Sequence, residues 1–224
     1  MIPPDHLTKT RIFHMTHVDN LPNILCQGKL LAKSRVKKNQ RKSIASEEVQ
    51  SRREKTLVTK PPGGVLHDYV PFYFAPRAPM LYCNHVGSIE NACDQSDIIY
   101  FVTTAQRLAK KTDFVFYDRH AVLSYAECFN QLEDLEEIDW RIFFEPPHVG
   151  GYAKYWQDRQ DSNHPHWSSR REIRQAEFLA HEKLDFSLIN GIAVNNAKIE
   201  ARVIDALQDT EYNHKVAIKP AWYF

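Results

Sequence analysis

Short apolar segments recur along this chain at irregular intervals, and they limit its fold more than any other feature of the sequence. The patterns predict strands at 11–16, 69–74, 97–103, 114–117, 174–181, 191–195 and 214–220. Helical patterns lie between some of them, at 19–28, 44–55, 104–111 and 197–209. Strands and helices do not alternate regularly, so we expect one α+β domain over 1–224, with flanking helices and a mixed β-sheet.

Glycine is scarce, with seven residues in 224. Neither G-x-G-x-x-G nor the phosphate-loop pattern is present, and this argues against Rossmann and P-loop enzymes. If a nucleotide binds, side chains and strand edges must hold it.

Cysteine and histidine spacings give no metal motif. The four cysteines contain no C-x-x-C pair, and the eleven histidines contain no H-E-x-x-H. We therefore expect no metal, and a metal-dependent nuclease is disfavoured. The start of the chain has no apolar signal segment and no window could span a membrane, so we expect a soluble cytoplasmic protein without a membrane partner.

Charge is unevenly distributed although the formal net charge is only +1. Residues 29–60 hold eleven Lys or Arg against three Asp or Glu, whereas 127–145 hold seven acids against one Arg. The basic part is either a solvated loop or a phosphate clamp for nucleic acid or a dinucleotide. The acidic part predicts an amphipathic helix, because apolar residues recur at three-residue steps: Phe129, Leu132, Leu135 and Ile138.

Three polar residues lie within apolar strand patterns: His14, Tyr73 and Glu177. Alternation points such side chains either to solvent or into a cleft. The segment 67–82 is rich in proline and aromatic residues, which fits a bulky core edge or a rigid wall for stacking a planar ring. Pro71 within it predicts an edge strand or a bulge.

Long motifs in a fixed order then resemble one known family. They read IFHMTHVDNLPNILCQGKLLA, EVQSRR, PPGGVLHDYVPFYFAPRAPMLY, FVFYDRHAVLS and RQAEFL. Over about residues 11–224 the chain resembles the DarT family of DNA ADP-ribosyltransferase toxins. The resemblance implies an ADP-ribosyltransferase-like split mixed β-sheet with an NAD-binding cleft, and NAD⁺ as the co-substrate. The expected reaction transfers ADP-ribose to a base in single-stranded DNA, with thymine favoured and guanine as the alternative acceptor, and it releases nicotinamide and blocks replication.

The resemblance also implies site residues. Glu177 and Arg53 match the catalytic positions, and the further NAD⁺ contacts are His14, Met15, Thr16, Asn23, Leu31 and Tyr73, with Arg53 shared. An NAD-binding element is expected at 36–53 and an acceptor-recognising loop at 120–177. Candidate DNA contacts are Lys37, Lys38, Arg41, Lys42, His120 and Arg174.

Residue chemistry agrees with these roles. Breaking the nicotinamide bond leaves a ribose oxocarbenium ion, which the Glu177 carboxylate can stabilise. His14 can hold the other ribose, and Tyr73 can stack on nicotinamide. Arg53 is expected to act by its charge, because an arginine normally stays protonated.

A partner is implied as well, since such toxins are paired with a macrodomain antitoxin that removes the ADP-ribose. The competing interpretation is a non-catalytic nucleic-acid-binding module that uses the basic stretch. It gives no reason for a carboxylate in a cleft that attracts phosphate.

Overall fold

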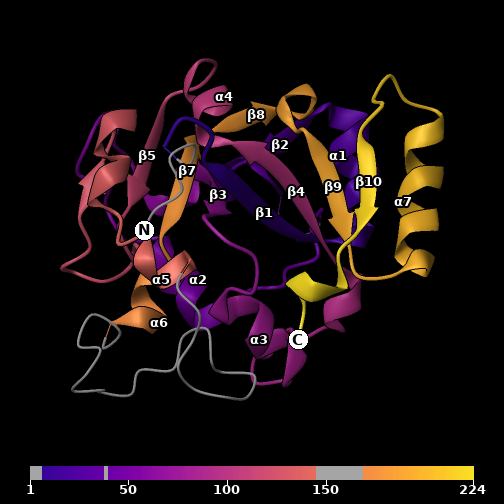
Figure 1. Ribbon diagram of the computed structural model, residues 1–224, viewed down its shortest axis with the longest axis horizontal. Helices are drawn as coiled ribbons and strands as arrows, with labels where there is room; N and C mark the ends of the chain where they lie inside the picture. Colours follow the sequence, from indigo (N-terminus) through magenta and orange to yellow (C-terminus); the bar gives the residue numbers. More distant parts are fainter. Residues whose placement is uncertain (1–6, 38–39, 145–168) are drawn as a thin grey trace.

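The structure is a computed structural model that describes residues 7–37, 40–144 and 169–224. Its centre is the antiparallel pair β1 (Arg11–His17) and β4 (Ile98–Thr104), which pair over seven residues. Most side chains of both strands are buried, as expected for continuous apolar runs in the middle of a sheet. The two strands lie next to each other in the middle of the sheet (Figure 1).

Eight strands form one sheet in the order β10-β9-β4-β1-β3-β7-β5-β6. Only β9 and β10 pair in parallel among these strands, and α7 connects them, so the sheet is mixed as predicted. The remaining strands are β3 (Tyr69–Tyr73), β5 (Phe114–Tyr117), β6 (Cys128–Phe129), β7 (Glu177–His181), β9 (Gly191–Val194) and β10 (Lys215–Ile218). A second, two-stranded sheet joins β2 (Lys29–Leu31) to β8 (Lys183–Asp185), and the sequence patterns did not indicate either strand.

The sheet splits between β1 and β3. These strands register at one residue pair, Phe13 with Tyr73, whereas β3 pairs with β7 at five positions. Where the two backbones separate, Nδ1 of His14 lies 2.8 Å from the carbonyl oxygen of Pro71. Pro71 predicted an edge strand or a bulge, but β3 lies inside the sheet, between β1 and β7. Proline has no N–H to donate, which fits the short pairing of β3 with β1. The split fits the predicted fold class.

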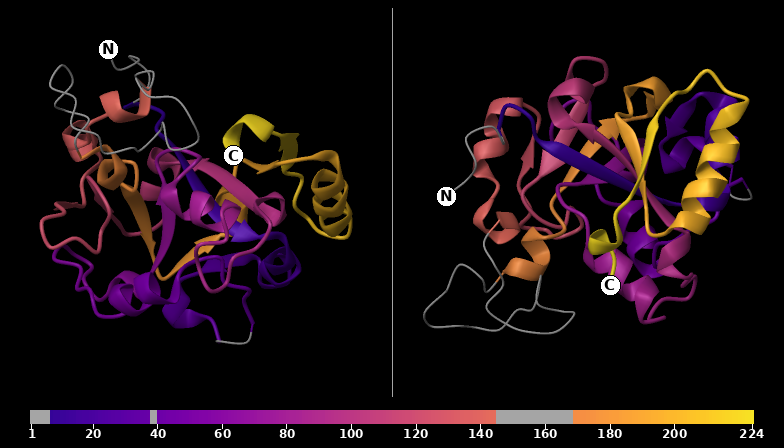
Figure 2. Two further views of the ribbon diagram at one scale, coloured as in Figure 1. Left: turned by 90° about the horizontal axis from the view of Figure 1, so that it is seen from below. Right: turned by 45° about the vertical axis from the view of Figure 1, so that its right-hand side comes forward.

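Seven helices are described: α1 (Leu21–Gln27), α2 (Glu47–Arg53), α3 (Pro79–His85), α4 (Ala105–Ala109), α5 (Arg141–Phe144), α6 (Arg170–Ile173) and α7 (Ala197–Gln208). In Figures 1 and 2, α7 lies beside β10 at one edge of the sheet, and in Figure 1 α2, α3 and α6 lie below the sheet. Residues 67–82, for which a bulky core edge and a rigid wall both remained open, form a short 3-10 turn, β3, a turn and the first part of α3. No helix in the described ranges is long and apolar enough to cross a membrane.

Part of the acidic stretch was predicted wrongly. An amphipathic α-helix was expected, but the chain forms β6 and then a 3-10 helix over Leu132–Glu137. The three-residue spacing of its apolar side chains matches the three-residue turn of a 3-10 helix better than the 3.6-residue turn of an α-helix. Phe129 belongs to the sheet, where its ring stacks on Phe116 with centroids 5.2 Å apart.

The predicted helix at 19–28 begins later than expected. A 3-10 turn covers Val18–Asn20, and α1 then runs to Gln27. Asp19 does not cap α1; its carboxylate pairs instead with Lys42 at 3.2 Å and with Arg202 at 2.5 Å. Gly28 ends the helix in the left-handed conformation with φ of 63°.

Candidate active site

A cavity of about 200 Å³ opens at the split in the sheet. It brings together residues from β1, β3 and β7, from α2 and α3, and from the loop after β5. The predicted residues His14, Met15, Arg53, Tyr73, His120 and Glu177 all line it. His14 and Glu177 are 163 positions apart in the chain, so the fold brings distant segments together at one site.

Glu177 and Arg53 form a buried ion pair at this site. Nη1 of Arg53 donates to Oε1 of Glu177 at 2.7 Å, and the two residues are 7% and 3% exposed. Glu177 is the first residue of β7 and lies opposite Tyr73 of β3 and Tyr117 of β5. Nη2 of Arg53 is buried without a hydrogen-bond partner among the described residues. A donor in this state is suited to an incoming acceptor atom.

The pair fixes the ionisation of Arg53. Burial, the largest effect, lowers the pKa of its guanidinium, but the charge of Glu177, their hydrogen bond and the nearby Tyr73 and Tyr117 outweigh it. The pKa of Arg53 is therefore raised above its ordinary value, and the side chain remains a cation. Burial also raises the pKa of Tyr73, and the charge of Glu177 adds to this, so its phenol is neutral and suited to stacking.

His14 is a neutral hydrogen-bonding group. A carbonyl only accepts, so Nδ1 of His14 carries the proton that it donates to Pro71, and Nε2 is left as an acceptor. Burial, the main cause, lowers the pKa of His14 to about 4; the bond to Pro71 opposes this and the charge of Arg41 adds to it. At neutral pH the ring can accept a hydrogen bond from a ribose hydroxyl.

A second, smaller cavity of about 40 Å³ continues from the first. It is lined by the predicted NAD⁺ contacts Thr16, Asn23 and Leu31, and it shares His14 and Arg41 with the first cavity. Arg41 was predicted to contact DNA, and the structure places it in the lining of both cavities. Its position between the two cavities is where the pyrophosphate of a dinucleotide would lie if each cavity held one nucleoside.

Asn20 holds the loop that carries Arg41. Its Nδ2 donates to the carbonyl of Lys42 and to Oγ1 of Thr16, both at 2.9 Å, and its Oδ1 accepts from the N–H of Lys42 at 2.8 Å. This buried clamp spans 22 positions in the chain. No motif or spacing in the sequence indicated it, because the loop and the end of β1 meet only in the folded chain.

Helix α2, which carries Arg53, is fixed from outside the cavity. Oε1 of Gln50 accepts from Nζ of Lys33 at 2.8 Å and lies 3.1 Å from Nε2 of His67. Burial, with the positive charges of Lys33 and Arg53, lowers the pKa of His67 to about 4. At its other side, Arg52 reaches the carbonyl of Val122 at 3.4 Å in the loop that contains His120.

The other candidate DNA contacts differ in position. Lys37 is exposed, Lys42 is exposed but paired with Asp19, and Lys38 lies outside the described residues. Arg174 is 5% exposed; its Nη2 donates to the carbonyl of Pro76 at 2.9 Å, and its guanidinium lies 5.2 Å from the Phe143 ring centroid. The expected acceptor loop at 120–177 includes 145–168, which lie outside the described residues.

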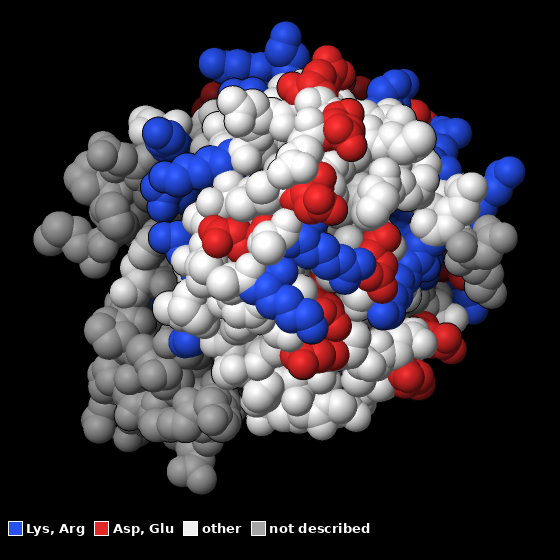
Figure 3. All heavy atoms as spheres, turned by 90° about the vertical axis from the view of Figure 1, so that its right-hand side faces the viewer, with Lys and Arg blue, Asp and Glu red and all other residues white. Residues whose placement is uncertain are grey.

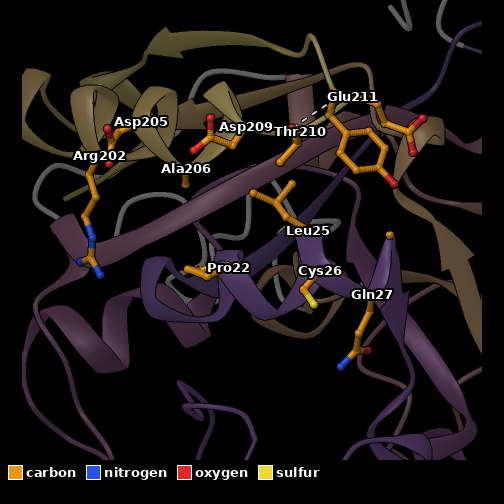
Figure 4. Close-up of a pocket in the computed structure, with 12 residues that line it drawn as sticks. Pro22, Leu25, Cys26, Gln27, Arg202, Asp205, Ala206, Asp209, Thr210 and Glu211 are labelled. Carbon is orange, nitrogen blue, oxygen red and sulfur yellow. Dashed lines mark hydrogen bonds between the residues drawn. The ribbon is translucent and has the colours of Figure 1, made fainter.

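A larger groove of about 770 Å³ lies away from this chemistry, between α1 and α7. Figure 4 shows Pro22, Leu25 and Cys26 on one wall and Arg202, Ala206 and Asp209 on the other. On the α7 side of the molecule, acidic and basic side chains are intermixed (Figure 3). The described residues of that face form no continuous basic path of the kind that binds single-stranded nucleic acid.

A split mixed sheet, with a buried glutamate, a histidine and a tyrosine around its cleft, defines an NAD⁺-dependent ADP-ribosyltransferase. The comparisons with known proteins agree. The model of the family described as "ssDNA thymidine ADP-ribosyltransferase, DarT" matches residues 13–224, and the chain belongs to this family.

Individual relatives show the same likeness. A DNA ADP-ribosyl transferase of Thermus sp. (strain 2.9) is 42% identical over 218 residues, which cover 96% of each chain. The structure of Thermus sp. 2.9 DarT in complex with ADP-ribosylated single-stranded DNA superposes with a TM-score of 0.84 at 40% identity, over 97% of both chains. The complex of that protein with NAD⁺ gives a TM-score of 0.81 at 38% identity, over the whole of both chains. A Thermosipho africanus protein, 24% identical over 95% of this chain and 49% of its own, is a fusion of such a transferase with a DNA ADP-ribosyl glycohydrolase.

Proposed function

We propose that this chain is a toxin that transfers ADP-ribose from NAD⁺ to thymine in single-stranded DNA and so blocks replication. The observation that carries the proposal is the buried Arg53–Glu177 pair in a cavity shared with His14 and Tyr73. A protein that only bound nucleic acid would gain nothing from a buried carboxylate at this position, since it repels phosphate.

The charge and position of each residue then suggest its role in the reaction. The carboxylate of Glu177 stabilises the positive charge that develops on the nicotinamide ribose as the glycosidic bond breaks. Tyr73 stacks on the nicotinamide ring, and Nε2 of His14 accepts a hydrogen bond from the other ribose. Met15, Thr16, Asn23 and Leu31 complete the walls.

The two arginines supply positive charge. Arg41, between the two cavities, binds the pyrophosphate; burial is the main cause that lowers the pKa of Arg41, and the charge of the neighbouring Arg53 lowers it further. A dianionic pyrophosphate relieves this repulsion when it binds. Arg53, with its raised pKa, acts as a cation that stabilises negative charge on the acceptor base.

The acceptor is single-stranded, because the ring nitrogen of a paired base is not accessible and unpairing costs a few kcal/mol. Exposed Lys37 lies on the basic loop beside the cleft and is available to the DNA backbone, with Lys38 and Lys42 as further candidates from the sequence. The cell also needs protection from such an enzyme. We propose a macrodomain partner that removes the modification, and the fused glycohydrolase of the Thermosipho relative supports this.

Mass spectrometry of single-stranded oligonucleotides after incubation with NAD⁺ tests the proposal. One oligonucleotide carries thymine as its only reactive base, a second carries guanine, and a third is the thymine strand in a duplex. We expect an ADP-ribose adduct and released nicotinamide with the first alone. An adduct on guanine alone would show that guanine, and not thymine, is the acceptor. The absence of any adduct would contradict the proposed transferase activity.

A further inference from the structure

Tyr125 is the most exposed aromatic side chain in the described part of the chain, and it lies in the loop between β5 and β6. It is 55% exposed, and its neighbours Ser124 and Glu127 are exposed and polar. Because no apolar patch surrounds the ring, it does not fit an apolar protein interface. A single open ring on a polar surface is suited instead to a flat polar ligand.

The ring of Tyr125 is held in one orientation. Its hydroxyl donates to Oε1 of Glu172 at 2.6 Å, and Cζ of Arg119 lies over the ring, 5.5 Å from its centroid. Arg119 is itself fixed by Asp118 at 2.7 Å. Since Arg119 covers one face and more than half of the residue is still exposed, the other face is open. A ring that is already ordered loses little conformational freedom when a planar group stacks on it.

The loop that carries Tyr125 is held by its own hydrogen bonds. At its ends, the N–H of Glu127 donates to Oδ1 of Asp118 at 2.9 Å, and the N–H of Asp118 donates to the carbonyl of Glu127 at 3.4 Å. Within the loop, the N–H of Leu123 donates to the carbonyl of His120 at 3.0 Å, and the N–H of Ala126 donates to that of Leu123 at 3.1 Å. The backbone therefore fixes the position of the ring as well.

Two connections place Tyr125 beside the candidate active site. Glu172, which accepts from its hydroxyl, follows Arg171 in α6, and Arg171 lines the cavity. The carbonyl of Glu172 also accepts from the N–H of His120 at 3.0 Å, and His120 lines the same cavity. A base next to one that enters the cavity is therefore within reach of the ring of Tyr125.

The charges around the ring favour a base over a phosphate. Asp118, Glu127 and Glu172 are acidic, and Arg119 is paired with Asp118. Acidic groups repel the phosphates of a DNA strand. A nucleobase is neutral and has a flat face, and stacking on aromatic side chains is a common way to hold single-stranded nucleic acid.

We propose that Tyr125 is a stacking platform for a base that flanks the acceptor thymine in the DNA strand. This inference rests on the proposed function. The flanking base lies against the open face of the ring, and Glu172 and Arg119 keep the ring in place. Every base has a flat face, so this contact adds affinity and holds the strand in register with the cavity without selecting one base.

The test compares wild type with Tyr125→Ala and Tyr125→Phe. Ile204→Ala is the control, because it removes another exposed apolar side chain, on α7. The DNA is a labelled single strand with one thymine, together with strands in which each base near the thymine is removed in turn to leave an abasic sugar. Binding is measured by fluorescence anisotropy, adducts by mass spectrometry, and nicotinamide release in the absence of DNA.

We expect Tyr125→Ala to weaken binding of the complete strand by about tenfold, and to keep nicotinamide release without DNA within about threefold. Wild type should lose about the same factor on one of the abasic strands. Tyr125→Ala should lose nothing further on that strand, because the ring and the missing base form one contact. Tyr125→Phe keeps the ring and should stay within about threefold of wild type. Ile204→Ala should match wild type throughout.

Unchanged binding in Tyr125→Ala, or the same additional loss in this variant on every abasic strand, would overturn the stacking role. A fall in nicotinamide release without DNA would also overturn it, since the substitution would then act through the NAD⁺ cleft. A wild type that shows the paired losses in binding but forms no adduct on the complete strand would support the stacking contact and reject the proposed transfer.

Salt dependence distinguishes stacking from a phosphate contact. Stacking releases no counterions, so the slope of log Kd against log salt concentration should be the same for Tyr125→Ala and wild type. A flatter slope in Tyr125→Ala would show that the lost contact is to phosphate, and it would overturn the proposal.

Discussion

Inside the cavity, Glu177 and Arg53 depend on each other. A buried charge that loses its partner is costly, whereas a buried pair with good geometry is tolerated. The two groups meet at 2.7 Å, and the free Nη2 of Arg53 leaves one donor for a ligand. The pair therefore keeps a carboxylate and a cation side by side in the cavity.

Glu177→Gln should reduce transfer by about 10²- to 10³-fold, because the amide fills the same space without the charge that stabilises an oxocarbenium ion. NAD⁺ binding should be much less affected. Nicotinamide release and DNA adducts measured side by side check this, with Glu48→Gln on the exposed side of α2 as the control. Turnover near wild type in a folded Glu177→Gln protein would contradict the assigned role.

Arg53→Lys should keep reduced but measurable transfer, whereas Arg53→Gln should lose far more, because lysine retains the charge. The raised pKa of Arg53 predicts no gain in wild-type rate as pH rises from 7 to 9. pH–rate profiles of wild type and Arg53→Lys at saturating NAD⁺ decide between charge and proton abstraction. A wild-type rate that climbs with pH, together with a lysine profile displaced to lower pH, would show that Arg53 acts as a base.

At the scale of elements, the cleft is completed by a loop and a helix that are held by side chains. The loop with Arg41 is attached to the end of β1 through Asn20, and α2 is attached through Gln50 to Lys33 and His67. Backbone pairing alone would not hold either element over the split in the sheet. Polar side chains therefore hold both walls of the cleft in place.

Asn20→Ala should weaken NAD⁺ binding by about tenfold, since the loss of a buried hydrogen-bond clamp costs about 1–3 kcal/mol and frees the loop with Arg41. Calorimetric titration with NAD⁺ measures the effect, and thermal unfolding reports how much of it is a general loss of stability. Asn213→Ala, at an exposed position, is the matched control. Unchanged affinity in Asn20→Ala would show that the loop is held by other contacts.

At the scale of the whole molecule, the split sheet buries several histidines in a neutral state. The pKa of His14 and of His67 is lowered to about 4, mainly by burial, and the pKa values of His17, His120 and His214 are lowered for the same main reason. All five histidines therefore have a lower pKa in the folded chain than in the unfolded chain. Below the unfolded value of 6.5 the unfolded chain binds more protons than the folded chain, so acid favours unfolding.

The free energy of unfolding should therefore be nearly constant above pH 7 and fall as pH drops from 6.5 towards 4. A shift as large as that of His14 corresponds to about 3 kcal/mol once pH has fallen below its folded-state pKa of about 4. Urea unfolding at several pH values measures the slope, and the double variant His14→Gln, His67→Gln should flatten it. Equal stability at pH 7 and pH 5 in wild type would contradict this account.

The sequence by itself determined the strands of the main sheet other than β6, the irregular order of strands and helices, and the residue types of the site. Apolar alternation and runs are local, so segments such as 97–103 and 191–195 could be assigned without the fold. The resemblance supplied His14, Tyr73 and Glu177, and the structure places all three at one cavity. A spacing of three residues was also present in the acidic stretch, but periodicity over so few turns did not separate a 3-10 helix from an α-helix.

Only the tertiary structure decided which distant groups meet. The pairing of Arg53 with Glu177, the clamp of Asn20 on Lys42 and the position of Arg41 between two cavities join segments that are far apart in the chain. The ionisation of His14, Arg53 and His120 follows from burial and from these neighbours. Local sequence shows neither how deeply a side chain is buried nor which charged groups lie beside it. Both arise only when the split sheet and its flanking loops come together around the cleft.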